Sequence, residues 1–275
     1  IYVCGRAGSG NGHCYVAKFN TSLTMQWRKS LTGSGFSRFE GVGFDSSGNV
    51  YVAGFAPDSS LTGPQDAVIA KYNSSGTLQW QRGLGRTSQY TSFNRLFVDS
   101  SGNSFACGLG HDGSSQTGLV AKYNSSGTLQ WHKHIKDSTY TINNASGIGT
   151  DSSGNIYVAG HANIPNEGNT IYAIKLNSSG AIQWSRTVDH VANRTEEVVG
   201  LAVNDSGDMY ITGSSYVNNA SYTDGIIVKF NSSGTLQFTR TFGNTGSKSE
   251  NLYNPVLDDS DNLYIAGWTT DGSVG

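Results

Sequence analysis

Hydrophobic and polar positions recur along this chain in two short modules. The first is Lys71–Trp80, KYNSSGTLQW, which returns letter for letter at Lys122–Trp131 and more loosely in three other places. The second is Asp45–Gly54, DSSGNVYVAG, a polar turn followed by an apolar run. A repeat at this level predicts one structural unit used many times. The aromatic position of the second module is Tyr2, Tyr51, Phe105, Tyr157, Tyr210 and Tyr264, with spacings of 49, 54, 52, 53 and 54 residues (51−2, 105−51, 157−105, 210−157, 264−210).

Each repeat predicts four short strands, A to D. Strand B, Val50–Ala53 and its equivalents, is apolar almost throughout, which is typical of a strand buried on both faces. Strand C ends at a recurring lysine, and strand D starts at Leu78–Trp80, where alternation places Trp inward and Gln outward. Asp or Asn followed by Gly favours tight A–B and C–D hairpins. Leu23 and Asp261 stand at two of these glycine positions, and Leu23 puts the geometry of its turn in question.

Four antiparallel strands per repeat predict an all-β chain folded as a β-propeller. Six copies of strand B against five each of A, C and D leave two alternatives. Either Leu252–Leu257 supplies strand A of the first blade and closes a five-bladed ring, or the chain is part of a six- or seven-bladed ring. The chain opens and closes inside a repeat, which indicates a fragment or a processed chain. We expect a single domain over residues 1–275, with approximate repeats 1–38, 39–92, 93–144, 145–197 and 198–250 and a partial repeat 251–275.

The two modules together resemble the SBBP family of bacterial and phage β-propeller repeats, and more distantly the NHL repeats. The resemblance rests on the segment Asp45–Gly54 followed by AKYNSSGTLQW, which ends at Trp80, and it covers essentially the whole chain. It implies a propeller, and the family name implies seven blades, which this chain does not supply. The family has no shared catalytic motif to carry over.

Strand order separates a constant face of the repeats from a variable face. The A–B and C–D turns share the constant face, whereas the B–C and D–A connections share the other and differ from repeat to repeat. Five of the six histidines fall in these variable connections, and variable loops on a rigid scaffold commonly carry function. The alternative is that the loops are merely unconstrained. The ligand-binding residues predicted on the variable face are Tyr90, His111, Tyr140, His161, Tyr216, Tyr222 and Trp268.

Composition and charge narrow the range of partners. Only 14% of residues are charged and the net charge is −2, so no basic field is present to hold nucleic acid or an anionic membrane. No apolar run approaches the roughly 20 residues of a membrane helix. The histidines fall one or two per blade, which favours exposed loop histidines over a metal site. Asp258–Asn262 is interpreted as a turn rather than a calcium site. We therefore expect no metal and no cofactor.

The recurring basic residues have a structural interpretation. The lysines that end strand C are predicted to cover an aromatic ring or to pair near the turn. The basic residues of strand D are predicted to guard an outer edge against pairing with another chain. The two columns are Lys18, Lys71, Lys122, Lys175 and Lys229 on strand C, and Lys29, Arg82, Lys133, Arg186 and Arg240 on strand D.

Catalysis and disulfide bonding find little support. Cys4 and Cys107 are interpreted as small core residues, and Cys14, across a hairpin from Cys4, leaves one disulfide open. Glu196 with Glu197, or Asp189 with His190, are candidates for acid–base chemistry. Adjacent side chains on a strand point to opposite faces, so neither pair converges by itself.

These observations favour a non-enzymatic recognition or structural propeller that binds a glycan or a protein through its variable face. Such a module suits an extracellular, cell-surface or virion location, for example a phage appendage or a bacterial surface protein, as a homo-oligomer or as part of a larger assembly. Short polar side chains and aromatic faces, which suit sugars, are both present in the variable loops. The alternatives are a hydrolase or lyase with a site at the channel mouth, and a purely structural spacer.

Overall fold

The regular elements of the computed structural model are all β-strands, and none of its described residues form a helix of the length and apolarity that a membrane crossing needs. The chain divides into two compact units, Ile1–Ile135 and Lys136–Gly275. The structure describes residues 1–8, 12–31, 36–57, 65–85, 89–137, 141–164, 168–188, 194–217, 222–243 and 249–270.

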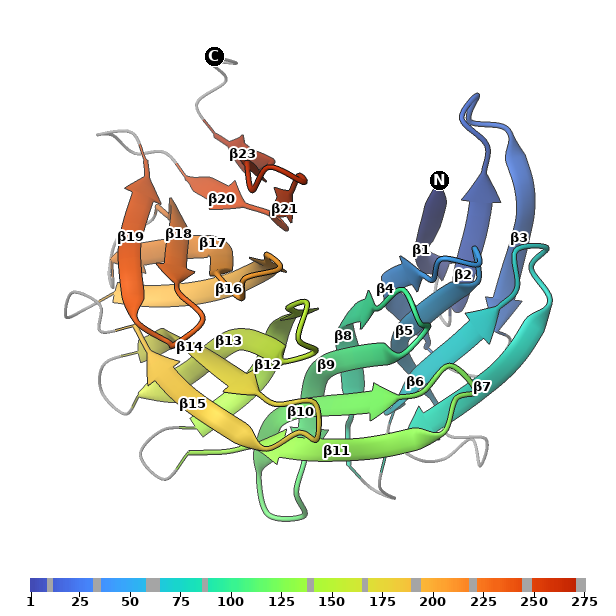
Figure 1. Ribbon diagram of the computed structural model, residues 1–275, viewed down its shortest axis with the longest axis horizontal. Coiled ribbons are helices and arrows are strands. Elements are labelled where there is room, and N and C mark those ends of the chain that lie inside the picture. The colour runs from blue at the N-terminus through green and yellow to red at the C-terminus, as the bar shows by residue number, and fades with distance from the viewer. Residues whose placement is uncertain are drawn as a thin grey trace. The chain divides into compact units, whose positions relative to one another are not determined.

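The first unit contains one three-stranded and two four-stranded antiparallel sheets, each ordered as the chain runs. Consecutive sheets pack side by side, with β4 against β8 (Figure 1). The first sheet has β1 (Tyr2–Ala7), β2 (His13–Phe19) and β3 (Met25–Leu31). The second has β4 (Arg38–Phe44), β5 (Val50–Pro57), β6 (Gln65–Tyr72) and β7 (Leu78–Leu84). The third has β8 (Ser92–Val98), β9 (Ser104–His111), β10 (Gln116–Tyr123) and β11 (Leu129–Ile135).

The second unit repeats this plan with two four-stranded sheets and two short hairpins. The first sheet has β12 (Thr141–Thr150), β13 (Ile156–Ile164), β14 (Gly168–Leu176) and β15 (Ile182–Thr187). The second has β16 (Arg194–Val203), β17 (Met209–Val217), β18 (Asp224–Phe230) and β19 (Leu236–Phe242). The last repeat has β20 (Glu250–Leu252) paired with β23 (Gly267–Thr269), and β21 (Val256–Leu257) paired with β22 (Leu263–Tyr264).

These sheets are the predicted propeller blades, with strands A to D in chain order. The pairing within the last repeat joins its strand A to its own strand B, and the ring size stays a prediction. Strands B and C are longer than the sequence predicted: β5 runs to Pro57, and β13 and β14 pair as far as Ile164 and Gly168. Much of each predicted B–C loop is therefore strand, because the alternating residues beyond the apolar run keep the ladder paired.

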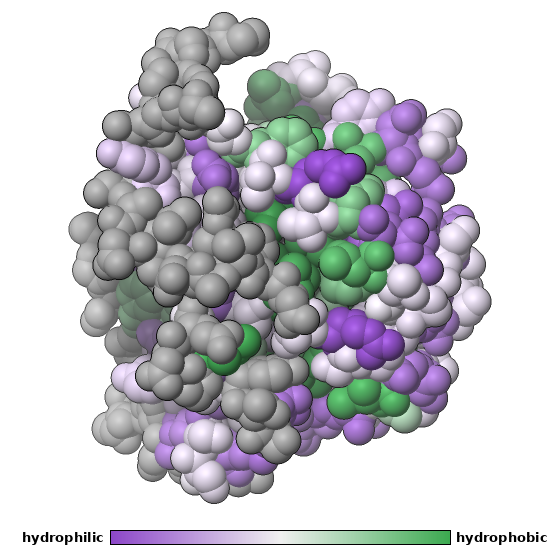
Figure 2. Space-filling view, turned by 90° about the vertical axis from the view of Figure 1, so that its left-hand side faces the viewer, coloured by the Kyte–Doolittle hydropathy of each residue, from purple (hydrophilic) through white to green (hydrophobic). Residues whose placement is uncertain are grey.

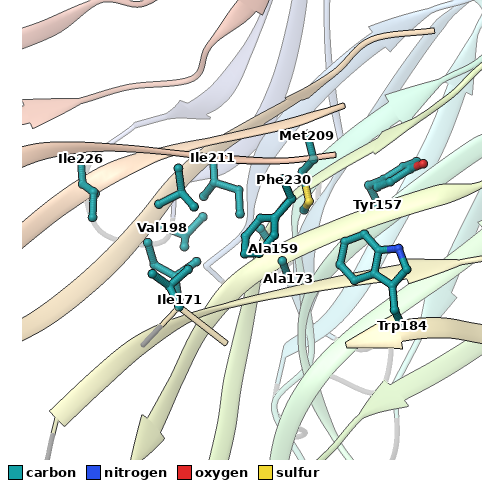
Figure 3. Close-up of a cluster of buried hydrophobic side chains, with 12 residues drawn as sticks. Tyr157, Ala159, Ile171, Ala173, Trp184, Val198, Met209, Ile211, Ile226 and Phe230 are labelled. Atoms are coloured by element: carbon teal, nitrogen blue, oxygen red, sulfur yellow. The ribbon is translucent and has the colours of Figure 1, made fainter. Parts of the chain in front are cut away.

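The hydrophobic core lies between successive blades, as the doubly buried B strands predict. Val50 to Ala53 are fully buried. In the second unit, Trp184 and Ile171 of one blade pack with Val198, Met209 and Phe230 of the next (Figure 3). Neither face of a single sheet is covered by its own strands, so the blades stabilise one another.

A set of contacts between consecutive blades on the constant face, called the clasp below, explains why the decapeptide KYNSSGTLQW recurs. The indole of Trp80 and the ammonium of Lys71 both donate to the Ser125 carbonyl in the C–D turn of the next blade, at 3.1 and 3.2 Å. Trp27 with Lys18, and Trp184 with Lys175, do the same to Ser74 and Ser232. Each lysine also lies over the tyrosine or phenylalanine of its own strand B, which confirms its predicted structural role.

The turn glycines and the arginines of strand D belong to the same clasp. Gly127 has a φ of +77°, and a Cβ there would fall 2.5 Å from the Trp80 ring, so the indole lies directly on the turn. Arg82 stacks beside Trp80 and its Nε donates to the Gly127 carbonyl at 2.9 Å. Arg186 makes the same contact with Gly234. These two arginines thus contact the next blade, and the role predicted for the basic column in guarding an outer edge stays a prediction.

The two turns without glycine adopt the same left-handed geometry as the others. Leu23 has a φ of 59° and Asp261 a φ of 61°. The Leu23 amide donates to the Asn20 carbonyl, as Gly76 does to Asn73. Asp258 organises its turn by accepting from Ser260 and Asn262, which confirms the turn interpretation of this acidic segment.

The three cysteines are free thiols. Cys4 lies opposite Val16 and Cys14 opposite Arg6, so the two thiols are diagonal neighbours rather than a facing pair. Diagonal positions are about 7–8 Å apart between Cα atoms, which is beyond the usual disulfide range. Burial raises the pKa of Cys4 to about 11 and that of Cys107 to about 12, so neither is a reactive thiolate.

Candidate functional site

A pocket of about 150 Å³ lies between the second and third blades of the first unit. The second blade and the segment after it supply one side, and strands β9, β10 and β11 of the third blade supply the other. Three imidazoles line it, together with apolar groups and a hydroxyl-bearing side chain. The lining residues are Leu84, Gly85, Thr91, His111, Leu119, His132 and His134.

The three histidines occupy positions that vary from blade to blade. His132 and His134 follow the clasp tryptophan by one and three residues, where the next blade has Ser185 and Thr187. The positions equivalent to His111, three residues after the strand B glycine, are Pro57, Asn163 and Tyr216. Imidazoles at three variable positions therefore line one pocket, and the scaffold does not require them, because other blades fold with other residues there.

His132 and His134 lie on the same side of β11, because alternate residues of a strand share a face. Their ring centroids are 5.9 Å apart with the planes nearly perpendicular. Nδ1 of His134 is 2.8 Å from the hydroxyl of Thr117 on β10, which fixes the orientation of its ring.

Gly110 makes room for the His134 ring. A Cβ at this position would fall 3.0 Å from Nδ1 of His134. Two other blades have Ala56 and Ala162 here, so a Cβ fits this position where no imidazole lies against it.

His111 is held by the turn that follows it. Its Nδ1 accepts the Gly113 amide at 3.1 Å, so the neutral ring carries its proton on Nε2. Asp112 accepts the amides of Ser114 and Ser115 in the same turn. The imidazole is thus presented to the pocket as an oriented group with a defined hydrogen-bond donor.

The remaining lining is apolar or already satisfied. The Thr91 hydroxyl accepts from the Ala67 amide and donates to the Leu84 carbonyl. With its hydroxyl engaged in this way, Thr91 contributes mainly its methyl group to the pocket lining. Leu84 and Leu119 add aliphatic surface. Imidazole edges beside apolar walls suit a ring that carries both hydroxyl groups and C–H faces.

The charge around the pocket is not basic. None of the described lining residues is Lys or Arg, and the Asp66 carboxylate lies against Gly85. Within the described residues, no group of three or more His, Cys, Asp or Glu side chains is arranged to hold a metal ion. The three imidazoles share a pocket without forming a coordination site.

The structure places the predicted binding residues in different settings. His111 lines the pocket, and Tyr90, 63% exposed, is in the segment just before β8. Tyr222 lies just before β18 and is exposed. His161, Tyr216 and Trp268 were predicted in loops or the tail, but they belong to strands β13, β17 and β23. Tyr140 and His190 lie outside the described residues.

His161 is partly buried on β13 in the second unit, and its Nδ1 has no partner among the described residues. Burial lowers the pKa of His161, and the nearby Glu197 opposes that effect.

Figure 2 shows hydrophobic areas on one face of the molecule interspersed with hydrophilic residues. The described residues of the second unit thus offer exposed aromatic rings, but no described pocket that gathers them.

The acidic residues of β16 follow the expectation for neighbours on a strand. Glu196 is 1% exposed and accepts from Ser215 at 3.4 Å, whereas Glu197 is exposed. They face opposite sides and do not form a carboxylate pair. Asp189, with His190, lies outside the described residues.

Sequence reasoning did not place His132 and His134 among the candidate residues. Their i, i+2 spacing on a strand was visible in the sequence. The interpretation as exposed loop histidines was wrong for His134, which lies within β11. A comparison of each repeat column, rather than of loops alone, contains the signal.

The comparisons with known proteins agree with the propeller fold. The sequence profile of the SBBP β-propeller repeat matches residues 130–166, from strand D of one blade through strand B of the next. The chain carries an SBBP-type β-propeller repeat. No relative was found among curated protein sequences.

Solved structures share the fold at low sequence identity. A protein of unknown function from Dyadobacter fermentans has a TM-score of 0.52 at 11% identity, covering 95% of this chain and 84% of that chain. A mutant of Synechocystis apocarotenoid oxygenase has a TM-score of 0.53 at 8% identity, covering 98% of this chain and 64% of that chain. A gluconolactonase from Xanthomonas campestris has a TM-score of 0.48 at 14% identity, covering 94% and 79%. At these identities the likeness concerns the fold alone.

Proposed function

We propose that this SBBP-type propeller is a non-enzymatic recognition module whose ligand is a glycan, bound through one sugar residue in the pocket lined by His111, His132 and His134. The observation that carries the proposal is that imidazoles from three variable repeat positions line that one pocket. Its volume, about 150 Å³, equals that of a protein cavity known to hold a six-membered ring.

The chemistry of the lining supports recognition rather than turnover. Imidazoles and leucines provide hydrogen bonds and apolar contact, which together suit a sugar ring. No carboxylate belongs to the described lining, so a glycosidase with two carboxylates has no basis there. The low charge and the Ser, Thr, Asn and Gly content suit a module on a cell or virion surface, and we include that location in the proposal.

A glycan array screened with three proteins tests this function. The parent is compared with His132→Ser/His134→Thr, which installs the residues that the next blade has at these positions. The third protein is Tyr222→Ala/Trp268→Ala, which removes exposed aromatic rings from the second unit.

We expect a sugar that binds the parent and the second variant but not the histidine variant. Loss only in the Tyr222/Trp268 variant would move the site to the second unit. No binding by a folded parent would overturn the glycan assignment and favour a protein partner.

A further inference from the structure

The turn from His111 to Gln116 depends on an imidazole for one of its hydrogen bonds. The Asp112 amide donates to the Ser115 carbonyl at 3.1 Å, and Asp112 Oδ1 accepts from Ser114 and Ser115. The Gly113 amide donates to Nδ1 of His111. Gly113 has a φ of +102°, so this residue takes a conformation that side chains disfavour.

Protonation of His111 is incompatible with that hydrogen bond. A neutral imidazole accepts at one nitrogen, whereas the imidazolium ion donates from both. Nδ1–H would then face the N–H of Gly113, and the turn would lose this closure. Because the same ring lines the pocket, opening the turn displaces one wall of the site.

The ionisable groups around His111 determine the electrostatic surroundings of its protonated ring. His132 and His134 on β11 line the same pocket, so protonation of several imidazoles places like charges together. Asp112 is adjacent in sequence, and its Oδ1 is engaged by Ser114 and Ser115. Asp66 on β6 lies against Gly85 across the pocket. With carboxylates rather than ammonium or guanidinium groups nearby, an anionic ligand is disfavoured while the imidazoles are neutral.

We propose that His111 is an acid-sensitive latch: its neutral ring closes the turn and completes the pocket around an uncharged sugar residue, and its protonation opens the turn and releases the sugar. The release step rests on the proposed function, whereas the latch itself does not.

His111→Asn provides a matched variant that does not titrate. An Asn side-chain oxygen accepts the amide two residues on, as in an Asx turn. Asn163 stands at the equivalent position of the next blade, so this side chain is compatible with the blade.

Hydrogen exchange at the Gly113 amide, measured by NMR and normalised to unstructured peptides, tests the latch without any ligand. On going from about pH 7.5 to about pH 5.5 we expect protection of Gly113 to fall by up to about tenfold, because a protonated imidazole cannot accept its hydrogen bond. Protection in His111→Asn should not depend on pH. The Gly127 amide, which is bonded to a backbone carbonyl, is the internal control in both proteins. A Gly113 amide whose protection is independent of pH in the parent would overturn the latch.

Sugar affinity at the same two pH values tests the release. For the parent we expect about tenfold weaker binding at acidic pH, and a clearly smaller change for His111→Asn. Tighter binding on acidification would identify an anionic ligand and overturn the proposal, as would equal pH dependence in the two proteins. If no sugar binds at either pH, the proposed function fails while the exchange experiment still decides the latch.

Discussion

The blades β8–β11 and β12–β15 are built alike, and they differ where one of them lines a pocket. Strand register is the same: Lys122 pairs with Phe105 as Lys175 pairs with Tyr157. On the variable side, Thr117 of blade β8–β11 contacts His134. Thr170 of blade β12–β15 instead donates to the Val188 carbonyl. The comparison teaches that the ladder and the clasp are constant features of a blade, whereas side chains outside them differ between blades and take up different contacts.

The largest effect should come from the clasp, which joins consecutive blades within each unit. Trp184→Ala removes an indole that packs in the core and donates to Ser232, and we expect unfolding to become easier by about 3–5 kcal/mol. Denaturant unfolding measures this change. A loss smaller than about 1 kcal/mol would mean that the clasp is not what holds consecutive blades together.

The A–B turn should give a smaller, pH-dependent effect. Burial would raise the pKa of Asp151, but hydrogen bonds from Asn155 and Tyr157 and the charge of Lys175 hold it below its ordinary value. A depressed pKa stabilises the fold above the ordinary Asp value of about 3.9, and that stability is lost as the pH falls below it.

Asp151→Asn should therefore flatten the acid limb of the stability curve, at a cost of about 2 kcal/mol at neutral pH. Asn204 already occupies this place in another blade and accepts the Asp208 amide. Thermal unfolding at several pH values measures the slope. An unchanged acid limb would show that this carboxylate does not couple folding to protons.

The histidine positions should affect binding far more than stability. His132→Ser/His134→Thr makes the third blade resemble the fourth, and we expect unfolding to change by less than about 1 kcal/mol. Binding of the glycan found on the array should weaken at least about tenfold, equivalent to about 1.4 kcal/mol. Gly110→Ala, which crowds the His134 ring, should weaken binding in the same direction. Calorimetric titration beside denaturant unfolding separates the two effects, and a destabilised protein with unchanged affinity would contradict the account.

The smallest expected change in stability comes from the turn at Leu23, which lacks the usual glycine and lies outside the pocket. Leu23 adopts a left-handed φ of 59° and is 69% exposed, so Leu23→Gly removes strain without losing burial. We expect a gain of about 1 kcal/mol in stability. Asp261→Gly should gain less, because Asp tolerates this region better. Thermal unfolding of both variants ranks them, and a destabilised Leu23→Gly would show that the leucine makes contacts of its own.

The sequence predicted the constant part of the molecule well, because there each residue repeats its structural task. The four-strand blade, the buried B strand, the turn at Asp45–Gly48 and the lysine beside an aromatic ring all follow from one copy and are checked by the others. The tryptophan was placed inward, but its bond to the Ser125 carbonyl could not be foreseen, because it joins residues of two blades.

The variable part was predicted less well, for a physical reason. Loop boundaries were drawn where the apolar run stopped, yet polar residues such as His161 and Gly168 continue the ladder. The pocket depends on β11 facing the preceding blade, and local periodicity does not reveal which neighbour a strand face meets. His111 was predicted as a binding residue, while its partners His132 and His134 were passed over.

The most direct test of the pocket follows the histidine side chains by NMR while the sugar found on the array is added. We expect the ring resonances of His111, His132 and His134 to shift together and with one affinity, while His161 in the second unit stays unchanged. If His161 shifts and the three pocket histidines do not, the ligand does not bind in this pocket and the proposed site is wrong.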